Sequence, residues 1–175
     1  MTSPKQRIIE TALRLFSTQG YNTTGINQII SEANVAKASF YQYFKSKEDL
    51  CVEFLNARHT YWFNALNSFT ASETRVNSKV IASFDFLIFM NKKEDFRGCS
   101  FLNTLSEIPM DNQKILAVIQ NHKSDLRSYF LELLNNQELS DHVYLLFESS
   151  IIESQMFRSN ELIEVSKRLI TNLIQ

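Results

Sequence analysis

The sequence predicts an all-α protein of about nine helices, with a three-helix N-terminal domain over residues 1–46 and a helical C-terminal domain over residues 47–175. Only 3 glycines and 2 prolines occur in the chain, so few residues suit the tight turns of an all-β protein. Apolar residues recur instead at the spacing of one helix face. Capping residues stand where several of these periodic segments begin.

The first predicted helix begins at Ser3-Pro4-Lys5-Gln6. Ser3 can accept a hydrogen bond from a helix amide, Pro4 suits the first turn, and Gln6 can complete a capping box. We expect the helix to end at Gly20 in a left-handed conformation.

Two short helices are predicted next. Thr24 is the expected N-cap of the second helix, which ends near Ala33, and Asn34 is expected at positive φ in the turn that follows. The third helix spans about residues 36–44. Both helices are expected to turn apolar side chains toward a small core, which would contain Ile26, Ile29, Ile30, Phe40 and Phe44. Phe40 and Phe44 are thus assigned to this core rather than to a binding surface.

Longer helices are predicted for the rest of the chain. The fourth starts at a capping box, Ser46-Lys47-Glu48-Asp49, and runs to about Ser72. Asn160 is the expected cap of the last helix, and Pro109 separates two of the others. The later helices are expected at about 75–91, 96–107, 111–135, 140–158 and 161–174.

The charge is unevenly distributed along the chain. Residues 1–50 carry six basic and four acidic side chains, net +2, and residues 51–175 carry twelve and fifteen, net −3. This sign suits an N-terminal module that meets phosphate groups. Two cysteines are too few for a disulfide framework, and no signal-peptide pattern or membrane-length apolar stretch is found, so we expect a cytoplasmic protein without a membrane partner.

Residues 23–50 have the spacing of a helix-turn-helix, which any pair of short helices could also show. Their identities are more specific, because the segment resembles the DNA-binding domain of the TetR (tetracycline repressor-like) family. That family's recognition region commonly reads A-G-V-S-K-G-T-L-Y-x-H-F-x-S-K-E-x-L. The matching residues are Ala33, Val35, Lys37, Tyr41, Phe44, Ser46, Lys47, Glu48 and Leu50. The chain departs from the pattern at Asn34, Ala36 and Ala38, and Ala36 removes a cap and a phosphate contact.

The resemblance implies contact with double-stranded operator DNA through the third helix. Lys37 is the first choice for base recognition, Ala38 and Ser39 allow close approach, and Gln42 can pair with adenine. Phosphate contacts are expected from Thr24, Tyr41, Tyr43 and Lys47. For the two tyrosines, the alternative is a place at the rim of the core.

The resemblance also implies an effector pocket in the aromatic-rich C-terminal domain, although its composition alone fits an ordinary core. The candidate effector or redox residues are His59, Tyr61, Trp62, Cys99, Phe101 and Asn103. The segment around Cys99 is similar to a G-C-x-x-x-N stretch in one branch of these regulators, some of which sense electrophiles. A helix start and the neighbouring Arg97 would favour the reactive thiolate. The alternative is a small structural residue.

The last two helices have broad apolar faces that one chain cannot easily bury, unless they close the monomer core. A second copy could cover them, and two-fold symmetry would place two recognition helices in successive major grooves of a palindrome. The expected homodimer residues are Phe147, Ile151, Met156, Leu162, Leu169, Ile170 and Leu173.

The expected function is a ligand-responsive regulator, by resemblance a repressor, that an unknown small-molecule or electrophile effector releases from DNA. An enzyme is the main alternative, but no nucleophile elbow, phosphate loop, dinucleotide fingerprint or zinc-protease helix is found, and the histidines lack ligand spacing. We therefore expect no catalytic residues, no metal and no cofactor. The other alternative is a helical DNA-binding or protein-interaction module without a small-molecule effector.

Overall fold

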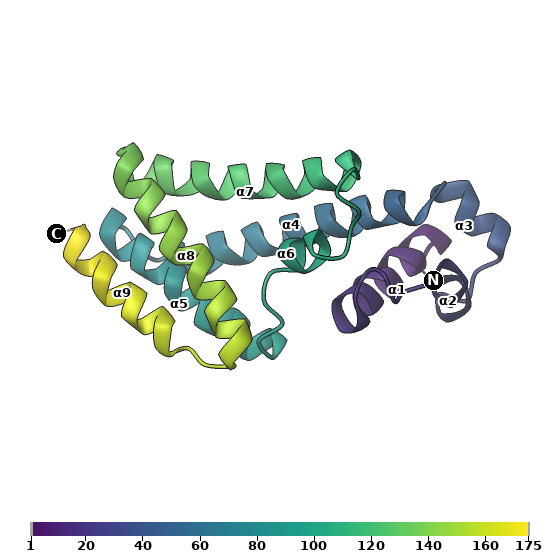
Figure 1. Ribbon diagram of the computed structural model, residues 1–175, viewed down its shortest axis with the longest axis horizontal. Coiled ribbons are helices and arrows are strands. Elements are labelled where there is room, and N and C mark those ends of the chain that lie inside the picture. The colour runs from purple at the N-terminus through teal and green to yellow at the C-terminus, as the bar shows by residue number, and fades with distance from the viewer. Residues whose placement is uncertain (1, 175) are drawn as a thin grey trace. The chain divides into compact units, whose positions relative to one another are not determined.

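The computed structural model describes residues 2–174, and these residues form nine α-helices and no strand (Figure 1). The predicted all-α class is confirmed, and each predicted helix is present. The helices are α1 (Pro4–Gln19), α2 (Ile26–Glu32), α3 (Lys37–Tyr43), α4 (Lys47–Thr70), α5 (Val76–Glu94), α6 (Ser100–Leu105), α7 (Gln113–Leu134), α8 (Gln137–Phe157) and α9 (Glu161–Leu173). None of the helices within residues 2–174 combines the length and the apolar character that crossing a membrane requires.

The described residues divide into two compact units. The first unit contains residues 2–60 and 100–120, and the second contains residues 61–99 and 121–174. The expected domain boundary at 46/47 differs from this division, because the start of α4 packs with α1; the Phe16 and Phe54 ring centroids are 5.3 Å apart. A DNA-binding domain over residues 1–46 remains a prediction.

The first unit has a small aromatic and aliphatic core in which α1, α2 and α3 contact one another. Phe40 and Phe44 are buried as predicted, and so is Ile29, whereas Ile26 and Ile30 are half-buried. Further buried members of this core are Ile8, Ala12, Leu15, Phe16, Leu50 and Phe54.

The caps of α1 and α4 form as predicted. The Ser3 hydroxyl accepts from the Gln6 amide at 3.2 Å, and the Ser46 hydroxyl accepts from the Asp49 amide at 3.1 Å. Gly20 ends α1 at a positive φ of 91°, but its ψ of 168° is extended, so the predicted left-handed helical conformation is wrong. Asn34 has the predicted positive φ, 50°.

The predicted cap of α2 is wrong, because Gly25, not Thr24, is its N-cap. Asn160 is the N-cap residue of α9 as predicted, but its side chain makes no capping hydrogen bond and instead accepts from Asn91 Nδ2 at 2.9 Å. The Ser159 hydroxyl accepts from the first α9 amide, that of Glu161, at 3.2 Å.

Helix α6 is shorter than the predicted segment 96–107. Asp95, Phe96 and Gly98 all have positive φ, between 51° and 69°, which interrupts helical geometry before Ser100. Cys99 therefore precedes α6 rather than starting it.

The second unit is built around α5, α8 and α9, which pack against one another (Figure 1). The α8–α9 contact includes a buried hydrogen bond of 2.9 Å between the Ser150 and Ser166 hydroxyls. The buried core residues are Val80, Phe84, Leu87, Leu126, Phe130, Val143, Tyr144, Phe147, Ile163, Ile170 and Ile174.

Candidate nucleic-acid interface

Helices α2 and α3 form a helix-turn-helix braced by α1. The tight turn is closed by a hydrogen bond from the Val35 amide to Ile30 O at 3.2 Å. Arg7 on α1 reaches this turn, where Nε donates to Ala33 O and Nη2 donates to Asn34 O, each at 3.1 Å. A guanidinium can hold two carbonyls in a fixed geometry because its donors lie in one plane. Arg7 thus fixes the turn that orients α3.

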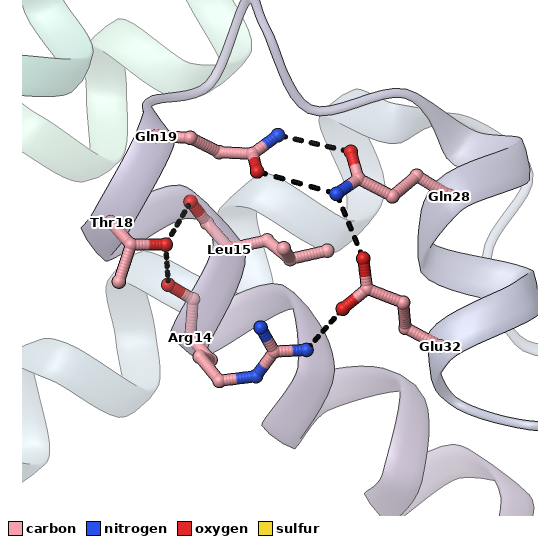
Figure 2. A network of polar contacts seen from close by, with 6 residues as sticks. All are labelled: Arg14, Leu15, Thr18, Gln19, Gln28 and Glu32. Carbon is pink, nitrogen blue, oxygen red and sulfur yellow. Dashed lines mark hydrogen bonds and ion pairs between the residues drawn. The ribbon is translucent and has the colours of Figure 1, made fainter.

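A polar network joins the far end of α1 to α2 (Figure 2). The Gln19 and Gln28 side-chain amides exchange hydrogen bonds of 3.0 and 3.3 Å. Gln28 also donates to Glu32 at 2.8 Å, and Arg14 pairs with the other Glu32 oxygen. The Arg14 hydrogen bond lowers the pKa of the Glu32 carboxyl. The network and Arg7 therefore hold α2 against α1 from both ends.

Helix α3 is anchored on one side and open on the other. Phe40 and Phe44 are fixed in the core, and their ring centroids are 5.9 Å apart. The expected contact residues on the open side are exposed, except that Ser39 is half-buried; they are Lys37, Ala38, Tyr41, Gln42 and Tyr43. Tyr41 is 45% exposed, and its ring packs at 5.3 Å from Phe40. It therefore lies at the rim of the core, and its contact with phosphate remains a prediction.

A hollow of about 540 Å³ lies beside the start of α3. Lys37 and Tyr41 line it together with Lys47 and the segment that leads into α2, residues 22–27. Most of these groups are polar, and two are cations. The hollow therefore has the chemistry to receive an anionic group.

Lys47 is already engaged within the protein. Its Nζ donates to Tyr21 O at 2.9 Å and to Thr24 O at 3.2 Å, and it lies 4.2 Å from the centre of the Tyr21 ring. Burial lowers the pKa of Lys47 and raises the pKa of the Tyr21 phenol to about 12. Lys47 thus ties the start of α4 to the segment between α1 and α2.

Thr24 is likewise engaged. Its side chain is fully buried, its hydroxyl donates to Gly20 O at 2.7 Å, and its amide donates to Tyr21 O at 3.3 Å. The hydroxyl and amide expected to meet phosphate thus stabilise the turn instead. Three other polar residues line this hollow and were not predicted to bind DNA: Asn22, Thr23 and Asn27. Their position in a run of polar residues around the start of α2 could have indicated them.

Comparisons of the sequence with known proteins agree with the helix-turn-helix seen in the structure. The model of the family "Bacterial regulatory proteins, tetR family" matches residues 8–54. The uncharacterized HTH-type transcriptional regulator YuxN of Bacillus subtilis is 46% identical over 56 residues, which are 32% of this chain and only 19% of YuxN. The HTH-type transcriptional regulator SAB2452 of Staphylococcus aureus is 25% identical over 160 residues, 91% of this chain and 76% of that protein.

A solved structure extends the likeness to the whole fold. The crystal structure of SCO4454, a TetR-family transcriptional regulator from Streptomyces coelicolor, matches with a TM-score of 0.88 at 22% identity, covering 98% of this chain and 95% of that one. Residues 8–54 therefore match the TetR-family model, and the fold of the chain matches that of a solved TetR-family regulator. Its N-terminal helix-turn-helix and C-terminal helical region are those of the TetR fold.

The six candidate effector residues are divided between the units. His59, Phe101 and Asn103 belong to the first unit, and Tyr61, Trp62 and Cys99 belong to the second. Trp62 packs edge-on against Phe86, His122 and Phe147, with ring centroids 5.3, 5.8 and 6.1 Å away. The Trp62 ring is therefore a member of an aromatic cluster.

Cys99 has a cationic neighbour other than the one expected. Its sulfur accepts from Lys123 Nζ at 3.5 Å, and the same Nζ donates to both Glu148 oxygens at 2.7 Å. Lys123 and Glu148 side chains are each only 14% exposed. Burial alone would lower the pKa of Lys123, but the interactions of its ammonium with Cys99 and Glu148 outweigh burial, so the pKa of Lys123 is raised. Cys51, by contrast, is buried, and burial raises the pKa of its thiol to about 12.

The expected dimer residues differ in exposure. Phe147 and Ile170 are fully buried in the core of their own chain, so their assignment to an interface is a correction of the sequence interpretation. Ile151 is half-buried. The other four expected residues are exposed: Met156, Leu162, Leu169 and Leu173. The same two helices carry three further exposed apolar residues that were not predicted as interface residues: Leu145, Ile152 and Phe157.

Proposed function

We propose that this chain is a TetR-family transcriptional regulator that binds double-stranded operator DNA through α3. The observation that carries the proposal is the outward face of α3, where Lys37 and Gln42 are exposed while Phe40 and Phe44 anchor the helix. A helix held in this way can enter the major groove and offer its N-terminal side chains to base edges. The proposed role is regulatory rather than enzymatic, and the proposed location is the cytoplasm.

The side chains have distinct roles in this proposal. Lys37 donates to guanine acceptors, Gln42 pairs with adenine, and Ala38 leaves room for close approach. Tyr41 and Tyr43 donate to phosphate groups from the exposed rim of α3. Lys47 and Thr24 act behind this surface by holding the segment that lines the hollow.

A binding measurement tests the proposal. The wild-type chain should shift a DNA fragment taken from upstream of its own gene, and Lys37→Ala should weaken that binding by about tenfold or more. Lys92→Ala removes an equal charge from an exposed position on α5 and should bind as the wild type does. Equal binding by all three proteins would exclude α3 as the recognition helix.

We further propose that the functional unit is a homodimer that reads a palindrome. Leu145, Ile152 and Met156 follow i, i+7, i+11 spacing on α8, and Leu162, Leu169 and Leu173 repeat that spacing on α9, so each helix presents one exposed apolar stripe. A second copy offers the matching stripes under two-fold symmetry.

An effector that favours a DNA-incompatible arrangement of the dimer would lower operator affinity by linkage. The proposed role as a repressor that the effector releases from DNA rests on the family resemblance alone. The alternative, a DNA-binding module without a small-molecule effector, predicts that no ligand both raises the melting temperature and releases DNA. A thermal-shift screen followed by release assays distinguishes the two.

A soft electrophile is the effector class favoured by Cys99. The ammonium of Lys123 lies 3.5 Å from its sulfur. The thiolate would add to the β-carbon of an α,β-unsaturated carbonyl, forming one S–C bond, and the resulting enolate would take a proton from water.

Cys99 reactivity is tested with N-ethylmaleimide. We expect one adduct per chain by intact mass and release of DNA, both lost in Cys99→Ser and both retained in Cys51→Ser, because the Cys51 thiol is buried. Release that persists in Cys99→Ser would remove Cys99 from the mechanism.

A further inference from the structure

The segment between α1 and α2, residues 20–24, is held from two sides. Lys47 binds two of its carbonyls, as described above. Glu107, two residues beyond the end of α6, binds its polar groups from the other side: Oε2 accepts from the Asn22 amide at 2.6 Å, and the Glu107 carbonyl accepts from Asn22 Nδ2 at 2.7 Å. We call residues 20–24 the clamped turn.

The contact with Glu107 is close. Gly20 lies in the turn at a φ of +91°, and a Cβ added there would lie 2.6 Å from Glu107 Oε1 and 3.0 Å from Oε2. No other residue type combines this backbone conformation with the available space. Gly20 therefore lets the turn approach the carboxylate closely enough for the Asn22 amide to donate to it.

The clamped turn borders the surface assigned to DNA. Asn22, Thr23 and Thr24 line the hollow that also contains Lys37 and Tyr41. A displacement of the turn would change the shape and polar lining of this hollow without altering any group on α3.

We propose that Glu107 is a positioning residue for DNA binding: through the clamped turn it sets the conformation of the surface that receives the DNA backbone. This inference rests on the proposed function. It also gives α6 a direct mechanical connection to that surface, because Glu107 follows Leu105, the last residue of α6, within the same unit.

Whether removal of the Glu107 side chain weakens or strengthens DNA binding distinguishes a positioning role from a purely electrostatic one. DNA is a polyanion, so removal of an acidic side chain near its binding surface should strengthen binding if charge alone mattered. A positioning role predicts the opposite, because the loss of the carboxylate leaves the Asn22 amide without its acceptor and loosens the turn on that side.

The test compares three variants in fluorescence-anisotropy titrations with one operator duplex. Glu107→Ala should weaken binding by about tenfold, the loss of one charge-assisted hydrogen bond. Glu107→Gln keeps an acceptor oxygen and should bind within about threefold of the wild type. Lys114→Ala breaks the Lys114–Asp49 ion pair in the same unit without touching the turn, and should bind within about twofold of the wild type.

Hydrogen exchange gives a second readout that does not depend on DNA. The Asn22 amide should exchange faster in Glu107→Ala than in the wild type and in Lys114→Ala. Unchanged exchange, or duplex binding by Glu107→Ala as tight as that of the wild type or tighter, would overturn the positioning role alone. A wild-type chain that binds no duplex would overturn the proposed function, and the role of Glu107 in DNA binding with it.

Discussion

At the scale of residues, Lys37 and Lys47 carry the same charge but have different surroundings. Lys37 is exposed at the start of α3, whereas Lys47 donates to two carbonyls and lies over an aromatic ring. The sequence motif contains both lysines and predicts a DNA contact for each. It cannot distinguish their roles, since the partners of Lys47 lie more than twenty positions away in the chain. Thr24 differs from its expected role for another reason, because the geometry of the turn directs its hydroxyl to Gly20 O, only four positions away.

Substitution by methionine separates the two lysines. Lys47→Met should lower the free energy of unfolding by about 1–2 kcal/mol, because two charge-assisted hydrogen bonds are lost. Lys37→Met should change it by less than about 0.5 kcal/mol and should instead reduce the salt dependence of DNA binding by about one counterion. Urea denaturation and affinity titrations over a salt series measure both effects. A stable Lys47→Met variant would show that the two contacts contribute little.

Acid sensitivity is expected at Asp49. The Lys114 hydrogen bond holds the pKa of the Asp49 carboxyl below its ordinary value of 3.8. Because the folded-state pKa is lowered, this interaction stabilises the fold fully above the ordinary value and is lost as the pH falls through the lowered folded value.

Lys114→Ala should therefore destabilise the fold at neutral pH by a fraction of a kcal/mol, as an exposed pair does, and by less once Asp49 is protonated. Denaturation curves at neutral pH and below the ordinary carboxyl pKa provide the comparison. A deficit that stays constant with pH would rule out this ion pair as its source.

At the scale of elements, the periodicity of apolar residues predicted every helix of residues 2–174, because each helix buries one face. The end of α5 and the start of α6 were less predictable, since non-glycine residues Asp95 and Phe96 adopt positive φ there. Periodicity also could not divide the broad apolar faces of α8 and α9 between the chain's own core and a partner. Phe147 and Leu169 have similar hydrophobicity, but only Leu169 is exposed.

The exposed stripes predict the effect of charge on assembly. Leu169→Glu places a carboxylate in the proposed apolar interface, where it would be buried without a partner, and should shift the protein from dimer to monomer. Val76→Glu introduces the same group at a similarly exposed apolar position on α5 and should leave the dimer intact. Light scattering after size-exclusion chromatography measures the mass, and a dimeric Leu169→Glu variant would place the interface elsewhere.

At the scale of the whole molecule, the strongest sequence signal lies in the N-terminal region. The family model ends at residue 54, and the 46% identity to YuxN spans 56 residues. The proposed recognition helix, α3, could be identified there because its core and exposed positions are local in sequence. The surroundings of Cys99 could not be identified, because Lys123 and Glu148 come from separate helices, and neither forms a recognisable motif with the thiol.

The most direct test of the account is methylation protection of guanine N7, which lies in the major groove. On its operator, the wild-type protein should protect guanines in two half-sites whose centres are about one helical turn apart, or a multiple of it, and Lys37→Ala should lose that protection. Protection at a single site, or protection that Lys37→Ala retains, would contradict a dimer that reads DNA through α3.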